Sequence, residues 1–394
     1  MRRPHWSRSR ALTLALIAVT WFASGIGSYL FLSSHRSTLA SQAKRPGEEE
    51  ASANGPLQRL PGSLYLVQDR TLYRLQHGTF TPLLKPAGAT GWTQPAISPS
   101  GQSLVVVRRD YAYSDLYLVD TAGHVQSQLT HDANKTIELN HWAMYPRLAA
   151  DGTTLFFSYD PKDRFNSYNV VLAVWSVPLG GSVSQMRKWT TPQGYTGGDL
   201  QPVPLPTGGV LYTKYSLDAA ANKILAQIYL TTRTGTAGRA LTPAADDCSQ
   251  PSLSPDGQRL AMICTGGTQL ANVVAAAFDG ASLGPRQVVV SGQMAAQPTW
   301  APDSTSLIYL AAQGVSGHFQ LWLQHIPQLP PPAAATPSPA RAAATSRGTR
   351  AAAPAPTPTP SPAAPAPTPT PLPAPVQLTT NLNFDATSTI AWHA

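Results

Sequence analysis

A short pattern that recurs five times is the feature of the sequence that most constrains its fold. In the clearest copies, Gln-Pro and an apolar residue precede a small turn and an apolar strand, and these copies begin at Gln94, Gln250 and Gln297. Two weaker copies begin at Tyr145 and Gln201. The Pro residues of successive copies lie 51, 56, 49 and 47 positions apart. This period suits four strands with their loops, the size of one β-propeller blade.

The residues of the pattern have physical reasons to recur. Pro-Ser-Gly or Pro-Asp-Gly between two apolar strands predicts a tight hairpin, because Pro fixes φ and Gly accepts positive φ. The Pro that follows Gln has no N–H, so it suits the edge of a sheet. The innermost strand of a blade presents such an edge to the central channel. We therefore expect each copy to begin with an innermost strand.

The two ends of the repeat array predict the number of blades. Residues 63–84 supply three strands that no Gln-Pro strand precedes, and residues 388–392 resemble the missing inner strand. The last strand is therefore expected to complete the first blade, which closes the ring and protects the sheet edges. Five copies and this shared blade predict an all-β fold, a six-bladed β-propeller.

These repeats resemble the WD40-like (PD40) repeats of TolB-like propellers, which also occur in the propeller domains of dipeptidyl-peptidase and prolyl-oligopeptidase families. The resemblance covers about residues 63–327 and 376–394, and its best match is Ser254-Pro255-Asp256-Gly257. It implies a fold far more strongly than a function. We expect neither the α/β domain that precedes the TolB propeller nor the hydrolase domain of the peptidases.

The N-terminal region carries a membrane signal. Residues 11–32 are an uncharged, apolar run of 22 residues, with four Arg before it and fewer basic residues after it. A helix of this length spans about 33 Å, enough for the hydrocarbon core, and the charge bias favours an inside N-terminus. We therefore predict a cytoplasmic tail (1–10), a transmembrane helix (11–32) and a linker (33–62), in a single-pass protein of a bacterial cell membrane. A cleaved signal peptide is the alternative.

A low-complexity segment rich in Ala, Pro and Thr follows the last full repeat. Of the 38 Pro residues, 17 lie between Pro327 and Pro375, so residues 328–375 cannot build a core and are expected to be disordered or polyproline II. Strand patterns flank the segment, which places it between the third and fourth strands of blade six. Residues 376–394 then end blade six and supply the closing strand. A tolerated surface insertion, a glycosylated or wall-spanning stalk and a polyproline ligand are the roles that this composition allows.

The net charge of +8 does not belong to the repeats. Residues 1–45 carry seven basic residues and no acidic one, whereas residues 51–327 and 376–394 together carry 18 basic and 17 acidic residues. A nucleic-acid-binding domain concentrates positive charge on its folded surface. We therefore expect no nucleic-acid partner.

The two cysteines lie eight residues on either side of Asp256. A hairpin centred on that turn places Cys248 opposite Cys264 on neighbouring strands, within reach of a disulfide. Export would allow oxidation. The pair is compatible with a structural disulfide and with two reduced, partly buried thiols.

The sequence supplies little that points to catalysis. Gly280-Ala281-Ser282-Leu283-Gly284 has the form of a hydrolase nucleophile motif, but it falls in a turn between two outer strands of blade five and lacks the strand-to-helix context that the motif needs. The nine His residues are scattered, without metal-ligand spacing. We therefore predict no catalytic, cofactor-binding or metal-binding residues.

Long loops indicate where a partner would bind. In propeller geometry the first-to-second and third-to-fourth strand turns lie on one face, here called the lower face, and the other loops lie on the opposite, upper face. Upper-face loops of blades two and three are long and rich in aromatic and basic residues, which are typical of protein interfaces. The predicted partner-binding rim consists of Arg109, Tyr111, Tyr113, Trp142, Tyr145, Arg147, Lys162, Arg164, Phe165 and Tyr168.

These observations favour a non-catalytic module that binds a protein, a peptide or another ligand of the cell envelope. The linker is expected to enter at the lower face, so that the anchor and the Pro-rich insertion share that face and the upper rim points toward a partner. The alternatives are a lactonase-type or hydrolase-type propeller enzyme and a scaffold subunit of an envelope complex.

Overall fold

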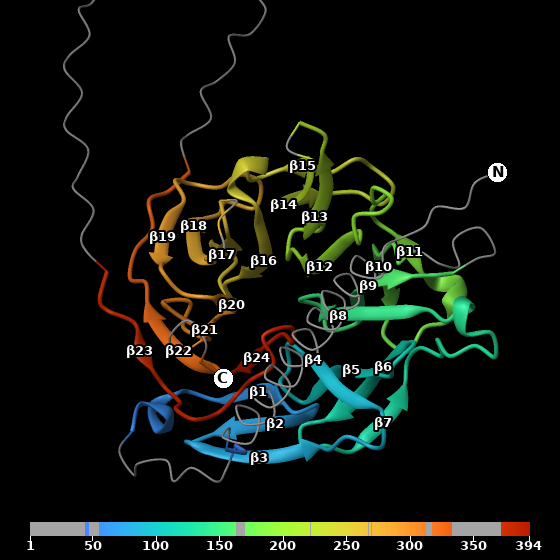
Figure 1. The fold of residues 1–394 in the computed structure, drawn as a ribbon, viewed down its shortest axis with the longest axis horizontal. Coiled ribbons are helices and arrows are strands. Elements are labelled where there is room, and N and C mark those ends of the chain that lie inside the picture. Colours follow the sequence, from blue (N-terminus) through green and yellow to red (C-terminus); the bar gives the residue numbers. More distant parts are fainter. Residues whose placement is uncertain are drawn as a thin grey trace, which may run out of the picture.

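The computed structural model describes residues 44–46, 55–162, 170–220, 222–266, 268, 270–312, 317–332 and 372–394. These residues form six antiparallel blades of four strands each, arranged around a central axis (Figure 1). One parallel bridge, Ser114 to Trp142, also joins the sheets of blades two and three. The prediction of an all-β, six-bladed propeller is confirmed.

Each blade runs from an inner strand at the axis to an outer strand at the rim. The inner strands of blades one to six are β24 (Ala391–His393), β4 (Gly91–Ile97), β8 (Trp142–Leu148), β12 (Asp199–Pro204), β16 (Cys248–Leu253) and β20 (Ala295–Trp300). The second strands are β1 (Ser63–Gln68), β5 (Ser103–Arg109), β9 (Thr154–Asp160), β13 (Val210–Asp218), β17 (Arg259–Cys264) and β21 (Ser306–Ala312).

The outer half of each blade is completed in the same order. The third strands are β2 (Thr71–Gln76), β6 (Ser114–Asp120), β10 (Ala173–Pro178), β14 (Lys223–Thr231), β18 (Asn272–Ala277) and β22 (Phe319–His325). The outer strands are β3 (Thr79–Leu84), β7 (Val125–Gln128), β11 (Arg187–Lys188), β15 (Arg239–Ala240), β19 (Gln287–Val290) and β23 (Val376–Gln377). Short 3₁₀ helices are η1 (Pro56–Arg59), η2 (Ile137–Leu139), η3 (Val183–Gln185) and η4 (Ala244–Asp246).

The last strand closes the ring. β24 pairs antiparallel with β1, from Tyr65 opposite Ala391 to Ser63 opposite His393, and Figure 1 shows the C-terminus beside blade one. Just before β24, the Ser388 hydroxyl accepts a hydrogen bond from the Gln94 N–H at 2.8 Å. The last residues of the chain therefore join blade one to blade two as well as completing blade one.

The recurring Gln-Pro pair is a β-bulge that links neighbouring blades. The register of all five inner strands that carry the pattern shifts across the pair, and its first residue has φ between +50° and +57°. Positive φ is uncommon outside glycine, so the position is a specialised one. Gln250 Oε1 accepts the N–H of Gln297 in the next blade at 2.6 Å, and Gln201 Oε1 likewise accepts the N–H of Gln250 at 3.0 Å. The glutamine is therefore repeated because it ties one blade to the next.

Cys248 and Cys264 lie directly opposite each other on β16 and β17 and form a disulfide. Both residues are buried in the apolar cluster between blades four and five. Gly280-Ala281-Ser282-Leu283-Gly284 lies in the turn between β18 and β19, where Phe278 bridges to Leu283. This is a hairpin turn and not a strand-to-helix elbow.

The described parts of the predicted linker lie at both faces: residues 55–62 lead into β1 at the lower face, as expected, whereas residues 44–46 do not. The Lys44 N–H donates to the carbonyl oxygen of Asn381 at 2.7 Å, and Gln68 Nε2 donates to the carbonyl oxygen of Lys44 at 2.7 Å. Gln68 ends β1 on the upper face, and Asn381 lies in the upper-face loop between β23 and β24. Residues 44–46 are therefore held at the upper face.

The ends of the predicted Pro-rich insertion are ordered. Leu329 and Leu372 pack against the core cluster between blades five and six, and Gln324 Nε2 donates to the Pro373 carbonyl oxygen at 2.9 Å. The predicted boundaries of 328 and 375 are therefore too wide, because apolar residues at both ends find a core to pack against. Residues 333–371 lie outside the described residues.

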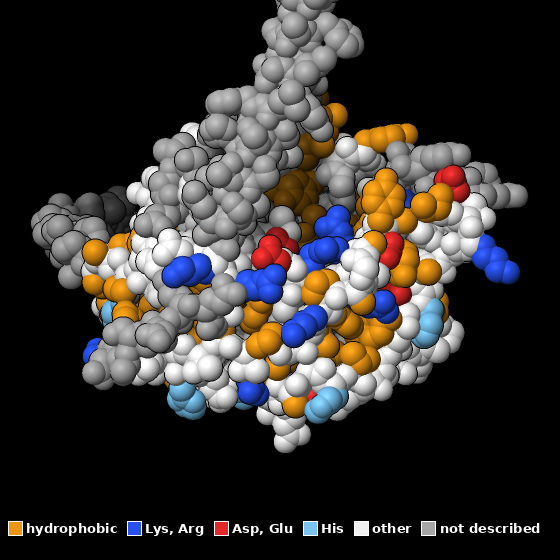
Figure 2. All heavy atoms as spheres, turned by 60° about the horizontal axis from the view of Figure 1, so that its bottom comes forward, with side chains coloured by type: hydrophobic (Ala, Val, Ile, Leu, Met, Phe, Trp, Pro, Cys, Tyr) orange, Lys and Arg blue, Asp and Glu red, His pale blue; other side chains and the backbone are white. Residues whose placement is uncertain are grey.

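The predicted membrane span, residues 11–32, also lies outside the described residues. None of the helices that the structure describes has the length and apolar character needed to cross a membrane. Figure 2, which brings the lower edge of Figure 1 forward, shows basic, acidic and His side chains interspersed with hydrophobic ones.

Candidate functional site

The boundary between blades three and four is built differently from the other five. At this boundary the glutamine is replaced by Tyr145, and among the described residues no hydrogen bond joins its side chain to blade four. The buried cluster here contains four residues (Phe156, Val174, Val210 and Tyr212), whereas each other boundary contains at least eight among the described residues. Fewer fully buried apolar residues therefore pack between these two blades.

A cleft with a cavity volume of about 1030 Å³ opens at this boundary on the lower face. Its walls are the first-to-second and third-to-fourth strand turns of blades three and four. The longest of these is the 179–186 segment between β10 and β11, which contains η3. Ser182 and Gln185 form a capping box around η3, so this segment has a defined shape. We call this space the blade 3–4 cleft.

Two aromatic rings form the floor of the blade 3–4 cleft. The ring centroids of Phe156, on β9, and Trp189, just after β11, lie 5.4 Å apart. Trp189 Nε1 donates to the Ser176 hydroxyl at 2.9 Å, so the polar edge of the indole is already satisfied within the protein. The ring faces are therefore what this floor offers to a ligand.

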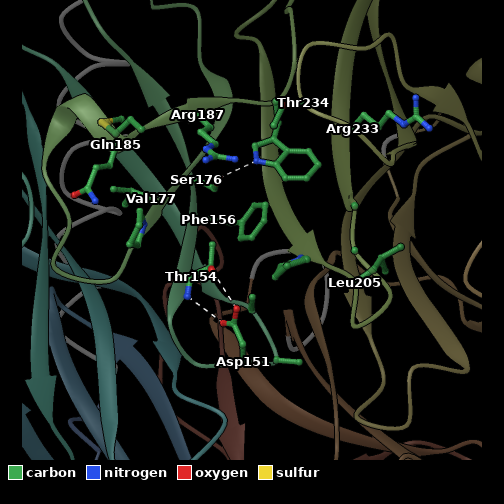
Figure 3. Close-up of a pocket in the computed structure, with 18 of the residues that line it drawn as sticks. Asp151, Thr154, Phe156, Ser176, Val177, Gln185, Arg187, Leu205, Arg233 and Thr234 are labelled. Carbon is green, nitrogen blue, oxygen red and sulfur yellow. Dashed lines mark hydrogen bonds between the residues drawn. The ribbon is translucent and has the colours of Figure 1, made fainter.

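The charged groups of the cleft differ in whether they already have a partner within the described protein. The Asp151 carboxylate accepts hydrogen bonds from the N–H groups of Thr153 and Thr154, and these bonds hold its pKa below the usual range. Arg187 and Arg233 are exposed, and no described residue pairs with either guanidinium. Figure 3 shows Arg187 beside the aromatic floor, Arg233 at the opposite border and Asp151 bonded to Thr154. The cleft can therefore offer positive charge and aromatic surface together, a combination that suits an acidic ligand.

The predicted rim residues do not form one surface. On the upper face, the Arg109 guanidinium lies 5.8 Å from the ring centroid of Trp142, Tyr111 is 86% exposed, and Tyr113 closes the same short loop. Tyr145 lies at the bulge of β8, where burial raises the pKa of its hydroxyl. Arg109, Tyr111, Tyr113 and Trp142 thus lie together on the upper face, whereas Tyr145 lies at the bulge of the inner strand.

The remaining rim residues lie elsewhere or outside the described residues. The Lys162 ammonium pairs with the Asp160 carboxylate at 2.6 Å, and both side chains are at most 3% exposed. An ammonium in such a buried pair is not available to a partner protein. Arg147 lines the lower half of the central channel. Arg164, Phe165 and Tyr168 lie outside the described residues.

A buried polar cluster supports the upper face behind Trp142. The Tyr159 hydroxyl donates to Asp132 Oδ1 at 3.1 Å and lies 2.7 Å from Nδ1 of His141. Burial and the nearby Asp132 carboxylate raise the pKa of Tyr159, so this hydroxyl keeps its proton. Because these residues come from β9 and from the loop before β8, the cluster orders a loop that the sequence suggested as a binding element.

Replacing Tyr159 with Phe is expected to lower the free energy of unfolding by about 2 kcal/mol, because Asp132 and His141 lose a buried hydrogen-bond partner. Urea denaturation of the purified chain measures this. Tyr111→Phe removes a hydroxyl from an exposed ring and is the matched control, with no expected change. Equal stability of the two variants would contradict the structural role of the Tyr159 hydroxyl.

The blade 3–4 cleft was not predicted from the sequence. Its residues are distributed over lower-face turns that are short or weakly patterned, and no motif connects them. The signal that pointed to the place was the replacement of glutamine by Tyr145 in the second copy of the repeat, in blade three, which the sequence alone presented as a weak copy. Within the described residues, no three His, Cys, Asp or Glu side chains are grouped so that they could hold a metal ion.

Six four-stranded blades, closed by the last strand, define the class of this protein as a six-bladed β-propeller. Its fold is that of the TolB-like propellers. TolB from Acinetobacter baumannii is similar over 67% of this chain and 61% of that chain, with a TM-score of 0.51 and 16% identity. The match thus spans about three fifths of the length of that TolB.

Two further solved structures are less similar. A putative TolB from Agrobacterium tumefaciens matches 68% of this chain and 85% of that chain, with a TM-score of 0.46 and 16% identity. A prolyl endopeptidase matches 62% of this chain and 37% of that chain, with a TM-score of 0.40 and 14% identity. No family model and no curated protein matches the sequence. Likeness at this level of identity concerns the fold and leaves function to the site.

Proposed function

We propose that this protein is a non-catalytic binding module, held outside a bacterial cell membrane by residues 11–32, that captures an acidic segment of an envelope protein or peptide in the blade 3–4 cleft. The observation that carries this proposal is that a cleft of about 1030 Å³ combines an aromatic floor with Arg187, which has no partner among the described residues. Aromatic and Arg side chains dominate the binding energy of protein interfaces.

The charge balance of the cleft favours an acidic partner. Asp151 is the only acidic residue among the described residues that line it, and its carboxylate is engaged by backbone N–H groups. Arg187 and Arg233 have no described partner to displace, so a ligand carboxylate gains a charge-assisted hydrogen bond without breaking an internal one. Stacking on the floor formed by Phe156 and Trp189 would add apolar contact.

The position of Lys44 supports an orientation in which the cleft is accessible. Residues 44–46 lie at the upper face, so a tether that precedes them reaches the propeller from that side. The lower face, with the blade 3–4 cleft, then points away from the membrane. This orientation is opposite to the one expected from the sequence, and it belongs to the proposal.

A photoreactive residue placed at Thr234, at the border of the cleft, is expected to crosslink a partner in native envelopes, whereas the same residue at Tyr111 is not. Adding Arg187→Ala should reduce the Thr234 crosslink about tenfold, because a charge-assisted hydrogen bond contributes about 1.5–3 kcal/mol. Quantified crosslink yield from the full-length chain is the measurement.

Arg109→Ala is the matched control, since it also removes an exposed guanidinium that lies beside a Trp ring, but on the upper face. We expect it to leave the Thr234 crosslink unchanged. A crosslink from Tyr111 that Arg109→Ala abolishes would instead assign binding to the upper face. A substrate turned over by the purified chain would contradict the non-catalytic part of the proposal.

A further inference from the structure

The central channel contains a second, smaller cavity in its lower half. Its volume is about 280 Å³, and the inner strands of all six blades contribute to its wall. The wall is mainly apolar, and each blade supplies one of the residues Trp392, Ile97, Leu148, Val203, Leu253 and Trp300. We call it the channel cavity. Its volume corresponds to about nine water molecules at roughly 30 Å³ each, so it holds a small group and not a folded segment.

Arg147 is the only charged residue among the described residues that line the channel cavity. One of its guanidinium nitrogens, Nη1, donates to the Pro146 carbonyl oxygen at 3.4 Å. No described carboxylate forms an ion pair with it. Burial lowers the pKa of Arg147 to about 10, so the side chain still carries its charge at neutral pH. A guanidinium has five N–H donors, and most of those in Arg147 have no acceptor from the described protein.

A half-buried cation in a mainly apolar channel, without a charged partner, is stabilised by a group of opposite charge. A carboxylate suits Arg better than other small groups do, because the guanidinium fork donates two parallel hydrogen bonds to its two oxygens. One cation without a second nearby matches a monoanion better than a phosphate dianion. The apolar wall favours a carboxylate that is attached to an apolar body.

The channel cavity adjoins the blade 3–4 cleft. Ala150, Pro204 and Pro206 line both spaces, and Pro206 and Pro255 place the opening of the channel cavity at the lower-face turns. A chain whose end enters the channel therefore has a continuous surface to follow. The two sites are chemically distinct, however, because Arg147 is half-buried in the channel wall and Arg187 is exposed at the rim of the cleft.

We propose that the channel cavity binds a carboxylate group carried on an apolar body, and that Arg147 is the residue that recognises it. A free carboxylic acid and the C-terminus of a peptide present the same group. This site does not depend on a function for the blade 3–4 cleft, since the wall of the channel cavity and its cation are complete without Arg187.

Calorimetric titration of the full-length chain in detergent tests the proposal with two matched pairs of probes. One pair is hexanoate and hexanamide, and the other is a short apolar peptide with a free C-terminus and the same peptide amidated. At least one acid is expected to bind about tenfold or more tightly than its amide, because the amide loses a charge-assisted contact. Tight binding of hexanoate identifies a free acid as sufficient, and binding of the peptide acid alone identifies a peptide C-terminus.

The variants assign the preference to a residue. Arg147→Gln should abolish the difference between acid and amide, Arg147→Lys should retain part of it, and Arg187→Gln should leave it unchanged. A preference that persists in Arg147→Gln, or the lack of any preference in the unmodified chain, would overturn the proposal. Loss of the preference in Arg187→Gln alone would move the carboxylate site to the cleft and also overturn it.

Thermal unfolding without ligand supplies an independent readout. An arginine that serves the fold would lower the Tm when it is replaced, whereas a ligand-binding arginine that stands unpaired in the empty channel should not. We therefore expect the Tm of Arg147→Gln to equal or exceed that of the unmodified chain. A lower Tm would assign Arg147 a structural role and count against the proposed site.

Discussion

A chain that ends at Thr387 is expected to lose about 5 kcal/mol or more of its free energy of unfolding, a large share of the 5–15 kcal/mol that stabilises a typical domain. The removed residues include Ile390, which belongs to the core cluster between blades six and one, and Trp392, which packs against it. They also include Ser388 and Thr389, which bond to Gln94 and Pro95 in blade two. Without these residues, blade one loses its inner strand and the contacts that this segment makes with blades six and two. β1 then becomes an unpaired edge.

Urea unfolding followed by tryptophan fluorescence measures this loss. Removal of Ala394 alone, an exposed residue beyond β24, is the control and should change stability little. A truncated chain that unfolds at the same urea concentration as the control would show that the closing strand contributes little, and that the other five blades hold the ring without it.

Replacing both cysteines with alanine is expected to lower the free energy of unfolding by about 3 kcal/mol, the value for a crosslink that closes a loop of about this length. Cys248 and Cys264 are separated by 16 positions, so the disulfide restricts the hairpin of β16 and β17 in the unfolded chain. The comparison of unfolding free energies between the two chains is the measurement.

A reducing agent provides the matching control for the disulfide. Dithiothreitol should destabilise the unmodified chain by about the same amount and leave the double-alanine variant unchanged. If the agent affected neither chain, or both chains equally, the disulfide would not be the source of the difference. Because this bond needs an oxidising compartment, its formation in cells only when residues 1–43 are present would also support export.

The fold could be predicted from the sequence because each copy of the repeat contains residues with specific backbone requirements. A hairpin that needs Gly at positive φ and an edge strand that accepts Pro recur at a nearly constant period, so each copy marks the same element. The role of the glutamine in the repeat could not be predicted in this way. Its amide acts between blades, as when Gln250 accepts the N–H of Gln297, and a contact between residues 47 positions apart leaves no local pattern.

The binding surface was predicted less well, for a related reason. Loop length and aromatic content favoured the upper face, but Lys162 turned out to be paired and enclosed with Asp160, and Arg147 to line the channel. Composition reports which side chains are present and not which of them find partners. The cleft near Arg187 depends on how two blades fail to fill the space between them, which is a property of the assembled ring.

By itself, the sequence determined the strands, the hairpins, the number of blades and the pairing of the last strand with the first, since local periodicity and turn chemistry specify these. Only the tertiary structure decided which blade boundary contains a cleft, which basic side chains have no partner among the described residues, and on which face Lys44 is held. These properties arise from side chains of different blades meeting or not meeting across the ring. The packing between blades, and not the pattern within a blade, therefore sets where this propeller can bind.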